Sequence, residues 1–233
     1  LGTLDGLPLA IELAASRMHL MSPPDLLKRL NQRFKLLYPQ DRSGTSRDRS
    51  LAAALDSSWE LLRPWEQAAL AQCSTFRGGF DWEAVEAVLD VSQWPEAPWV
   101  LDVVATLVER CLVQVTEVPG KSVRLSMLVS VTEYAAEKLE LDTRQATFQR
   151  HAQYYARWGH QSILDSLRVF GGLEKRYRLI GERENLVAAF ARSVEASWGQ
   201  EAAHLLAASL VVWRYTGPLA QVVLLGPALL ELE

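Results

Sequence analysis

Apolar side chains recur every three or four positions through most of the 233-residue chain, a spacing that predicts amphipathic helices. Asp81 is a typical N-cap residue, and Pro8 and Pro64 suit the first turn of a helix, where no backbone N–H is needed. The period changes to strand-like alternation in residues 112–128, on either side of a Pro-Gly-Lys turn at 119–121. The pattern therefore predicts a mainly α fold with one β-hairpin.

A polar stretch with Gly and Pro and no apolar period, residues 39–50, is the clearest linker in the chain. Residues 51–141 carry several helices, then the hairpin and a closing helix, which is the order of a winged helix-turn-helix. Residues 142–233 contain only helices, paired as at the start of a TPR-like stacked repeat. Residues 1–38 form a separate helical segment before the linker.

Composition bounds the broad class of protein. Half of the residues (49%) are hydrophobic and 22% are charged, which predicts a folded core and excludes global disorder. No apolar run reaches the length of about 18 residues that a membrane span needs. Both cysteines, Cys73 and Cys111, lie in apolar context, so we expect two reduced core thiols in a cytoplasmic protein.

Catalytic chemistry has no support in the residue spacing. The four histidines are scattered, and His151, among aromatic residues, is expected to pack in a helix pair rather than bind metal. Asp165, Glu182 and Glu184 do not form a carboxylate pair suited to acid–base chemistry. No Gly-rich loop ending in Lys-Ser/Thr occurs, so the chain is not expected to be an enzyme. A basic run is interpreted as a solvated helix face, with a protein or acidic contact as the second interpretation: Lys175, Arg176, Arg178 and Arg183.

Charge argues against a nucleic-acid interface in the winged-helix region. Residues 54–140 contain 14 acidic and 6 basic residues, a net charge of −8. The helix before the hairpin, residues 99–110, would be the recognition helix, yet it holds one Arg and no Lys, Asn or Gln. Because phosphate contacts need cations, we expect this helix to pack against protein rather than enter a DNA groove.

Several motifs together resemble the STAND class of P-loop ATPases, which includes the apoptosome and plant NB-ARC resistance proteins, and especially bacterial regulators of that class. The resemblance covers nearly the whole chain, and its ordered matches are more specific than Gly-Leu-Pro-Leu alone. They are LDGLPLAIELAASRM, the segment from SLAAALDSSWELL to DWEAVEAV, LVERCLVQV, EYAAEKL, RHAQYYARW and ERENLVAAF.

The resemblance implies that this chain is a fragment of a longer regulator. Residues 1–38 would be the end of a helical lid, and Gly6, Leu7 and Pro8 would contact nucleotide in the parent protein; in the isolated chain they are interpreted as a helix start. The implied cofactors, ADP or ATP with Mg, belong to the parent and not to the fragment. The implied partners are its own upstream nucleotide-binding domain, a second copy on activation, and an unknown protein or small-molecule signal at the helical repeats.

One feature of the family is missing. Better-known relatives carry a Met-His-Asp motif whose His touches a nucleotide phosphate, and alignment places it at Met127-Leu128-Val129. Leu128 can neither donate a hydrogen bond nor carry charge, so no site residue is assigned from that motif.

The favoured hypothesis is therefore a non-catalytic part of a signal-transduction ATPase. Its winged helix would be an arm between nucleotide core and helical sensor, with Gly78-Gly79 and the linker as hinge points. Two alternatives remain: a DNA-binding transcriptional regulator that uses the winged helix, and a helical scaffold that binds a protein partner.

Overall fold

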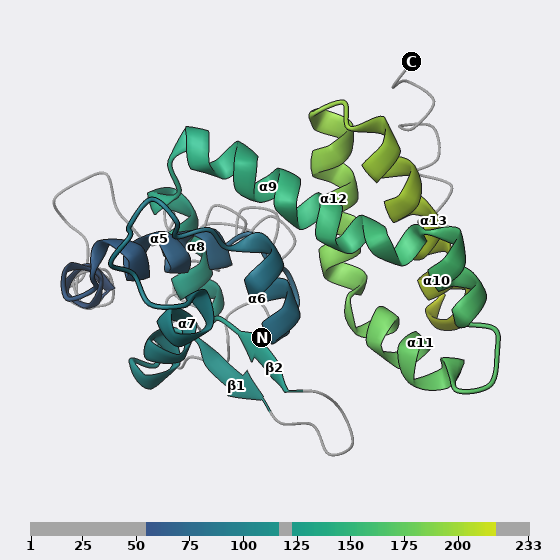
Figure 1. The fold of residues 1–233 in the computed structure, drawn as a ribbon, viewed down its shortest axis with the longest axis horizontal. Helices are drawn as coiled ribbons and strands as arrows, with labels where there is room; N and C mark the ends of the chain where they lie inside the picture. The colour runs from purple at the N-terminus through teal and green to yellow at the C-terminus, as the bar shows by residue number, and fades with distance from the viewer. Residues whose placement is uncertain (1–54, 117–122, 218–233) are drawn as a thin grey trace, which may run out of the picture.

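The computed structural model describes residues 55–116 and 123–217. Gly6, Leu7 and Pro8, the linker at 39–50 and the turn of the hairpin lie outside the described residues. Two regions of helices, which we call the first and second modules, are visible side by side in Figure 1, with residues 55–138 in one and residues 157–217 in the other.

The described part of the first module starts with helical residues 55–60. Pro64 occupies the first turn of the next helix, and Asp81 caps another by accepting a hydrogen bond from Ala84 N at 2.8 Å, both as predicted. The elements that follow are α5 (Pro64–Cys73), α6 (Trp82–Val88), α7 (Val100–Glu109), β1 (Gln114–Thr116), β2 (Arg124–Ser126) and α8 (Val129–Lys138).

The small sheet is antiparallel, with Val115 opposite Leu125. Phe80 extends it on the other side of β2, because its N–H and C=O exchange hydrogen bonds of 2.8 and 2.7 Å with Leu125. The order of the elements is the one expected of a winged helix: α5, this bridge, α6, α7 and then the hairpin. The mainly α fold with one small hairpin sheet is confirmed.

Helices alone make up the second module within the described residues, and α9 leads into it. Helix α9 ends at Ala156 and the chain turns in η3, where Gly159 lies close to α13. A Cβ at Gly159 would lie 1.8 Å from His204 O, so only glycine allows this close approach to α13. The elements are α9 (Leu141–Ala156), η3 (Arg157–Gly159), α10 (Gln161–Ser166), α11 (Gly172–Gly181), α12 (Arg183–Glu195) and α13 (Gly199–Thr216).

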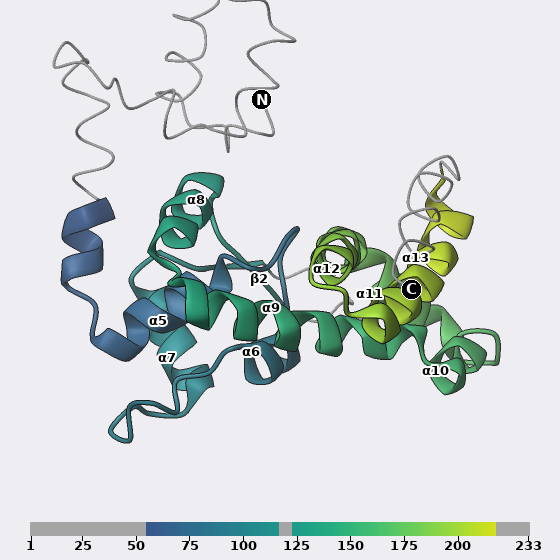
Figure 2. The same cartoon turned by 90° about the horizontal axis from the view of Figure 1, so that it is seen from above.

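Helix α9 joins the two modules: it extends from the first into the second in Figure 1, and Figure 2 shows the same path from above. It packs against α6 in one module and against α12 and α13 in the other. One hydrophobic core accordingly continues through both modules, from Leu70 and Phe80 to Phe190 and Leu205. This shared core ties the second module directly to the first.

Two sequence interpretations were wrong. Cys73 is buried, but Cys111 is exposed and follows α7 with a φ of 59°. The second error concerns one member of the basic run. Lys175 and Arg183 are exposed, as a solvated face requires. Arg178, however, forms ion pairs with Asp81 and Glu83 of the first module, each at 2.7 Å. The described helices include none with the length and hydrophobicity of a membrane span.

Candidate functional site

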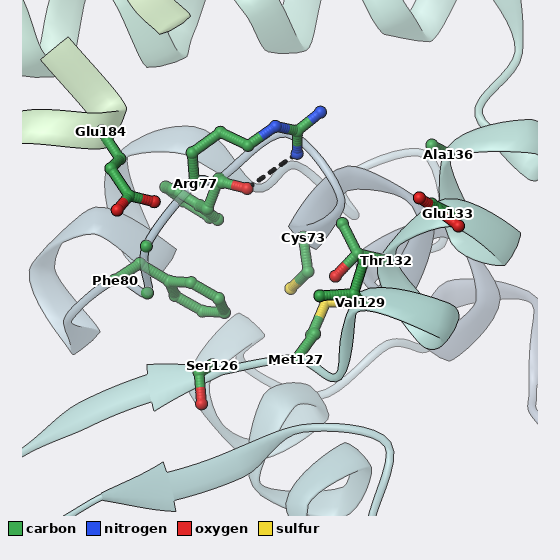
Figure 3. A pocket seen from close by; sticks show the side chains of 13 residues that line it. Cys73, Arg77, Phe80, Ser126, Met127, Val129, Thr132, Glu133, Ala136 and Glu184 are labelled. Carbon is green, nitrogen blue, oxygen red and sulfur yellow. Dashed lines mark hydrogen bonds between the residues drawn. The ribbon is translucent and has the colours of Figure 1, made fainter. Parts of the chain in front are cut away.

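Three segments that are distant in sequence enclose a pocket of about 570 Å³ where the modules meet (Figure 3). They are the loop between α5 and α6, the junction of β2 with α8, and the N-terminal turn of α12, which contributes Glu184. The loop holds the sequence Arg-Gly-Gly-Phe, residues 77–80. The junction includes Met127 and Val129, two positions of the aligned Met-His-Asp motif. We call this space the joint pocket.

The joint pocket has mixed chemistry. Its charged lining residues are Arg77, Glu133 and Glu184, and Figure 3 shows Glu184 on the side away from Glu133. The Arg77 guanidinium donates hydrogen bonds to the carbonyl oxygens of Ser74 and Phe76, at 2.6 and 2.9 Å. With two carboxylates against one cation, the lining has no excess of positive charge for a phosphate.

The wall made by the loop requires glycine. Gly78 and Gly79 have φ values of +69° and +90°, in the left-handed region that side chains disfavour. A Cβ on Gly79 would also lie 2.8 Å from the carbonyl oxygen of Leu125 in β2. The loop is thus held tightly against the hairpin.

Asn185 of α12 fixes the same loop from the other side. Its Oδ1 accepts from Arg77 N at 2.7 Å, and its Nδ2 donates to Gly79 O at 2.7 Å and to a Glu182 carboxylate oxygen at 2.9 Å. The side chain is fully buried, so these bonds compete little with water. The hinge role of Gly78-Gly79 stays a prediction, and the contacts favour a fixed joint.

An ion pair between Arg124 of β2 and Glu182 crosses the joint. Arg124 also donates to Gly79 O at 2.9 Å, so β2, the loop and α12 meet at one guanidinium. Burial alone would lower the pKa of Arg124, but the hydrogen bond and charge of Glu182 raise it overall. Arg124 therefore remains charged.

A second ion-pair group links α11 to α6. Arg178 lies 2.7 Å from both Asp81 and Glu83, and Tyr154 donates to Asp81 at 3.1 Å. Burial raises the pKa of Asp81, but its bonds from Ala84 N and Arg178 lower it below the ordinary value. The N-cap of α6 is thus also a contact between the modules.

His151 of α9 packs behind the loop, in agreement with the prediction that it packs between helices. It is fully buried between the rings of Phe76 and Tyr155, at centroid distances of 5.5 and 4.8 Å. Burial, followed by the charge of Arg192, lowers its pKa from 6.5 to about 3. The imidazole is neutral at physiological pH and acts in packing.

The helix in the recognition position presents an acidic face. Helix α7 buries Val103, Val104 and Leu107 and exposes Asp102 and Glu109. The cations of the first module that the structure describes all have internal contacts: Arg63 over Trp65, Arg77 on two carbonyls, Arg110 near Glu66, Arg124 on Glu182 and Lys138 over Tyr134.

The structure brings together some residues that sequence reasoning singled out separately. One pocket is surrounded by Gly78-Gly79, Met127 and Glu184. From the sequence, the two glycines were selected as a hinge, Met127 as a motif position and Glu184 as an acid without a catalytic partner. Asn185 was missed: it lies in the ERENLVAAF motif, but no sequence pattern indicates that its amide reaches residues 77 and 79. The predicted nucleotide contacts Gly6, Leu7 and Pro8 lie outside the described residues.

Comparison with known proteins finds relatives in mycobacteria. A protein of Mycobacterium tuberculosis H37Rv, provisionally named an HTH-type transcriptional regulator, is 35% identical over 214 residues, which cover 90% of this chain and 23% of the relative. Its counterpart in Mycobacterium bovis gives the same values. An uncharacterized protein of Mycobacterium tuberculosis is 36% identical over 152 residues, covering 64% of this chain and 38% of its own. No family model matches the chain, and no solved structure matches it. The chain thus spans about a quarter of the length of the first relatives.

Proposed function

We propose that this chain is a non-catalytic, regulatory part of a transcriptional regulator. The names of the longer relatives support the regulatory role. Within that role, the winged helix is an intramolecular arm that connects an upstream nucleotide-binding domain to the helical module.

The joint between the two modules is the observation that carries this proposal. Arg124–Glu182, Arg178–Asp81 and the bonds of Asn185 cross it, and the hydrophobic core continues through it. Buried charge-assisted hydrogen bonds of this kind fix orientation as well as adding energy. A movement imposed on the first module is therefore passed on to the second as a rigid displacement, which is what a coupling arm needs.

The joint pocket is the proposed contact with the upstream domain. Its lining includes Met127 and Val129, which flank Leu128, the position where the better-known STAND-class relatives carry the His that touches nucleotide. In the longer protein, ADP or ATP with Mg would bind upstream, Gly6, Leu7 and Pro8 would contact it, and a second copy would join on activation. A protein or small-molecule signal would bind the helical module.

A nucleotide assay on the longer protein tests this function. The protein is purified, denatured and analysed by chromatography for released ADP or ATP, beside Pro8→Ala and, as a matched control, Pro39→Ala in the predicted linker. We expect bound nucleotide in the parent protein and in Pro39→Ala, and a clear loss in Pro8→Ala. A well-folded parent without nucleotide contradicts the coupling role and leaves the chain as a protein-binding scaffold.

The second candidate is direct DNA binding by the winged helix, which the HTH-type names of the relatives and the element order favour. The engaged cations and the acidic face of α7 argue against it. Fluorescence anisotropy of labelled duplex DNA with the 233-residue chain separates the two. We expect no binding tighter than the nonspecific range of about 10⁻⁴ to 10⁻⁶ M at physiological salt. A Kd near 10⁻⁸ M for one sequence would establish DNA reading instead.

A further inference from the structure

Next to the joint pocket lies a second one of about 390 Å³, also formed by both modules. Three arginines line it: Arg77 of the α5–α6 loop, Arg144 of α9 and Arg192 of α12. Phe148 forms part of the wall, and Glu137 is the carboxylate in the lining. We call this space the arginine pocket.

The arginines of this pocket bond to backbone carbonyls. Arg144 donates to Leu139 O at 2.8 Å and Arg192 to Thr75 O at 3.0 Å, while Arg77 binds the carbonyls of Ser74 and Phe76. Two nearby carboxylates act on them from a distance: the charge of Glu133 raises the pKa of Arg77 and that of Glu195 raises the pKa of Arg192, in both cases against the lowering by burial. Arg124 and Arg178 of the same joint form ion pairs with carboxylates. Each guanidinium has five N–H donors, so backbone bonding leaves donors available.

Their placement has an electrostatic cost. Burial and then the charge of Arg77 lower the pKa of Arg192 to about 10, although Glu195 partly offsets this. The guanidinium carbon of Arg192 lies 4.0 Å from the centroid of the Phe148 ring, and this contact holds the guanidinium in position. Three like charges in one pocket, pre-positioned by carbonyls and an aromatic ring, have the geometry and the charge that suit an anion.

We propose that the arginine pocket binds the phosphate group of a small molecule. Guanidinium groups match phosphate oxygens with paired hydrogen bonds, and the volume lies within the range of small-ligand pockets. Because the three arginines come from the loop, α9 and α12, a bound phosphate would neutralise the repulsion and hold the modules together more firmly. This proposal does not rest on the proposed nucleotide contact at Pro8.

Calorimetric titration of the 233-residue chain with inorganic phosphate, pyrophosphate and ADP tests this proposal. We expect binding of pyrophosphate and a rise in Tm in its presence. Arg192→Gln and Arg144→Gln should each weaken binding about tenfold or more, which corresponds to the loss of one hydrogen bond to a charged group. The exposed Arg168→Gln, outside the pocket, is the matched control and should bind as the parent chain does.

Circular dichroism shows whether each variant is folded. Arg144→Gln loses only one hydrogen bond to a carbonyl oxygen, so this variant remains informative if Arg192→Gln unfolds. Equal affinity for ADP and pyrophosphate indicates a site for free anions, whereas tighter binding of ADP indicates a phosphoester; both support the proposal. Pro8→Ala should leave pyrophosphate binding unchanged, which distinguishes this site from the nucleotide function. The proposal is overturned by no pyrophosphate binding up to about 1 mM, or by equal loss in Arg168→Gln.

Discussion

The buried amide of Asn185 accepts a hydrogen bond from the backbone N–H of Arg77 at 2.7 Å, although 108 positions separate the two residues. The same amide donates to Gly79 O, so the loop cannot move away from α12 without breaking both bonds. Because breaking them would leave buried polar groups unpaired, this relationship defines the joint energetically as well as geometrically.

Asn185→Ala should strongly destabilise the chain. The change leaves Arg77 N–H and Gly79 O without their amide partner and a small cavity in the joint. We expect a loss of about 3 kcal/mol in the free energy of unfolding, from one or two unsatisfied polar groups at about 1–3 kcal/mol each. Urea unfolding followed by circular dichroism measures it. Gln161→Ala, which removes an exposed bond to Asp165, is the control and should change stability by less than about 0.5 kcal/mol.

Gly79→Ala should cost more than Gly171→Ala, although both glycines have similar positive φ values, +90° and +83°. Alanine at either position is strained by roughly 1 kcal/mol. At Gly79 the new Cβ would also meet Leu125 O at 2.8 Å, whereas it meets nothing within 4 Å at Gly171. We expect about 3 kcal/mol for Gly79→Ala. Equal effects of the two changes on the urea midpoint would show that the loop yields, as a hinge would.

Local structure was predictable from the sequence because its causes are local. Pro64 and Asp81 mark helix starts through the geometry of one turn, and strand alternation marks the hairpin. The need for glycine at position 159 could not be predicted, because its cause, the backbone of His204, comes from a helix 45 positions away in sequence. Helical periodicity contains no information about that contact.

The joint could not be predicted for the same reason. Arg178 belongs to a basic run that resembles a solvated face, and its partner Asp81 was already accounted for as an N-cap. Nothing within α11 indicates that one arginine of the run is paired across 97 positions. The pockets lie between helices that such long-range ion pairs hold together, so they can be located only from the tertiary structure.

The two thiols should differ sharply in reactivity. Cys111 is exposed after α7, while Cys73 is buried and its pKa is raised by that burial. With a disulfide reagent at pH 8, absorbance should report one thiol reacting in the native chain and the second only in denaturant. Cys111→Ser should abolish the fast reaction, and Cys73→Ser should preserve it. Two fast thiols in native protein would contradict the burial of α5 against the core.

The buried His151 should make the chain less stable as pH falls below neutrality. Its pKa is about 3 in the folded chain against 6.5 ordinarily, because burial and the charges of Arg192 and Arg77 disfavour the imidazolium, while Asn185 only partly favours it. Between these values the unfolded chain binds a proton that the folded chain does not, so unfolding becomes more favourable with acid. From pH 7 to pH 5 this amounts to about 2 kcal/mol.

His151→Gln isolates that contribution, since glutamine does not titrate. The variant should be less stable at pH 7, because it replaces a ring packed between Phe76 and Tyr155, yet its stability should vary less between pH 7 and pH 5. Carboxylates with lowered pKa, such as Asp81 and Glu83, titrate below this window and affect both proteins alike. Urea unfolding at pH 7, 6 and 5 gives the two slopes. Parallel slopes would mean that His151 has its ordinary pKa in the folded chain as well, and the tight packing behind the loop would then be wrong.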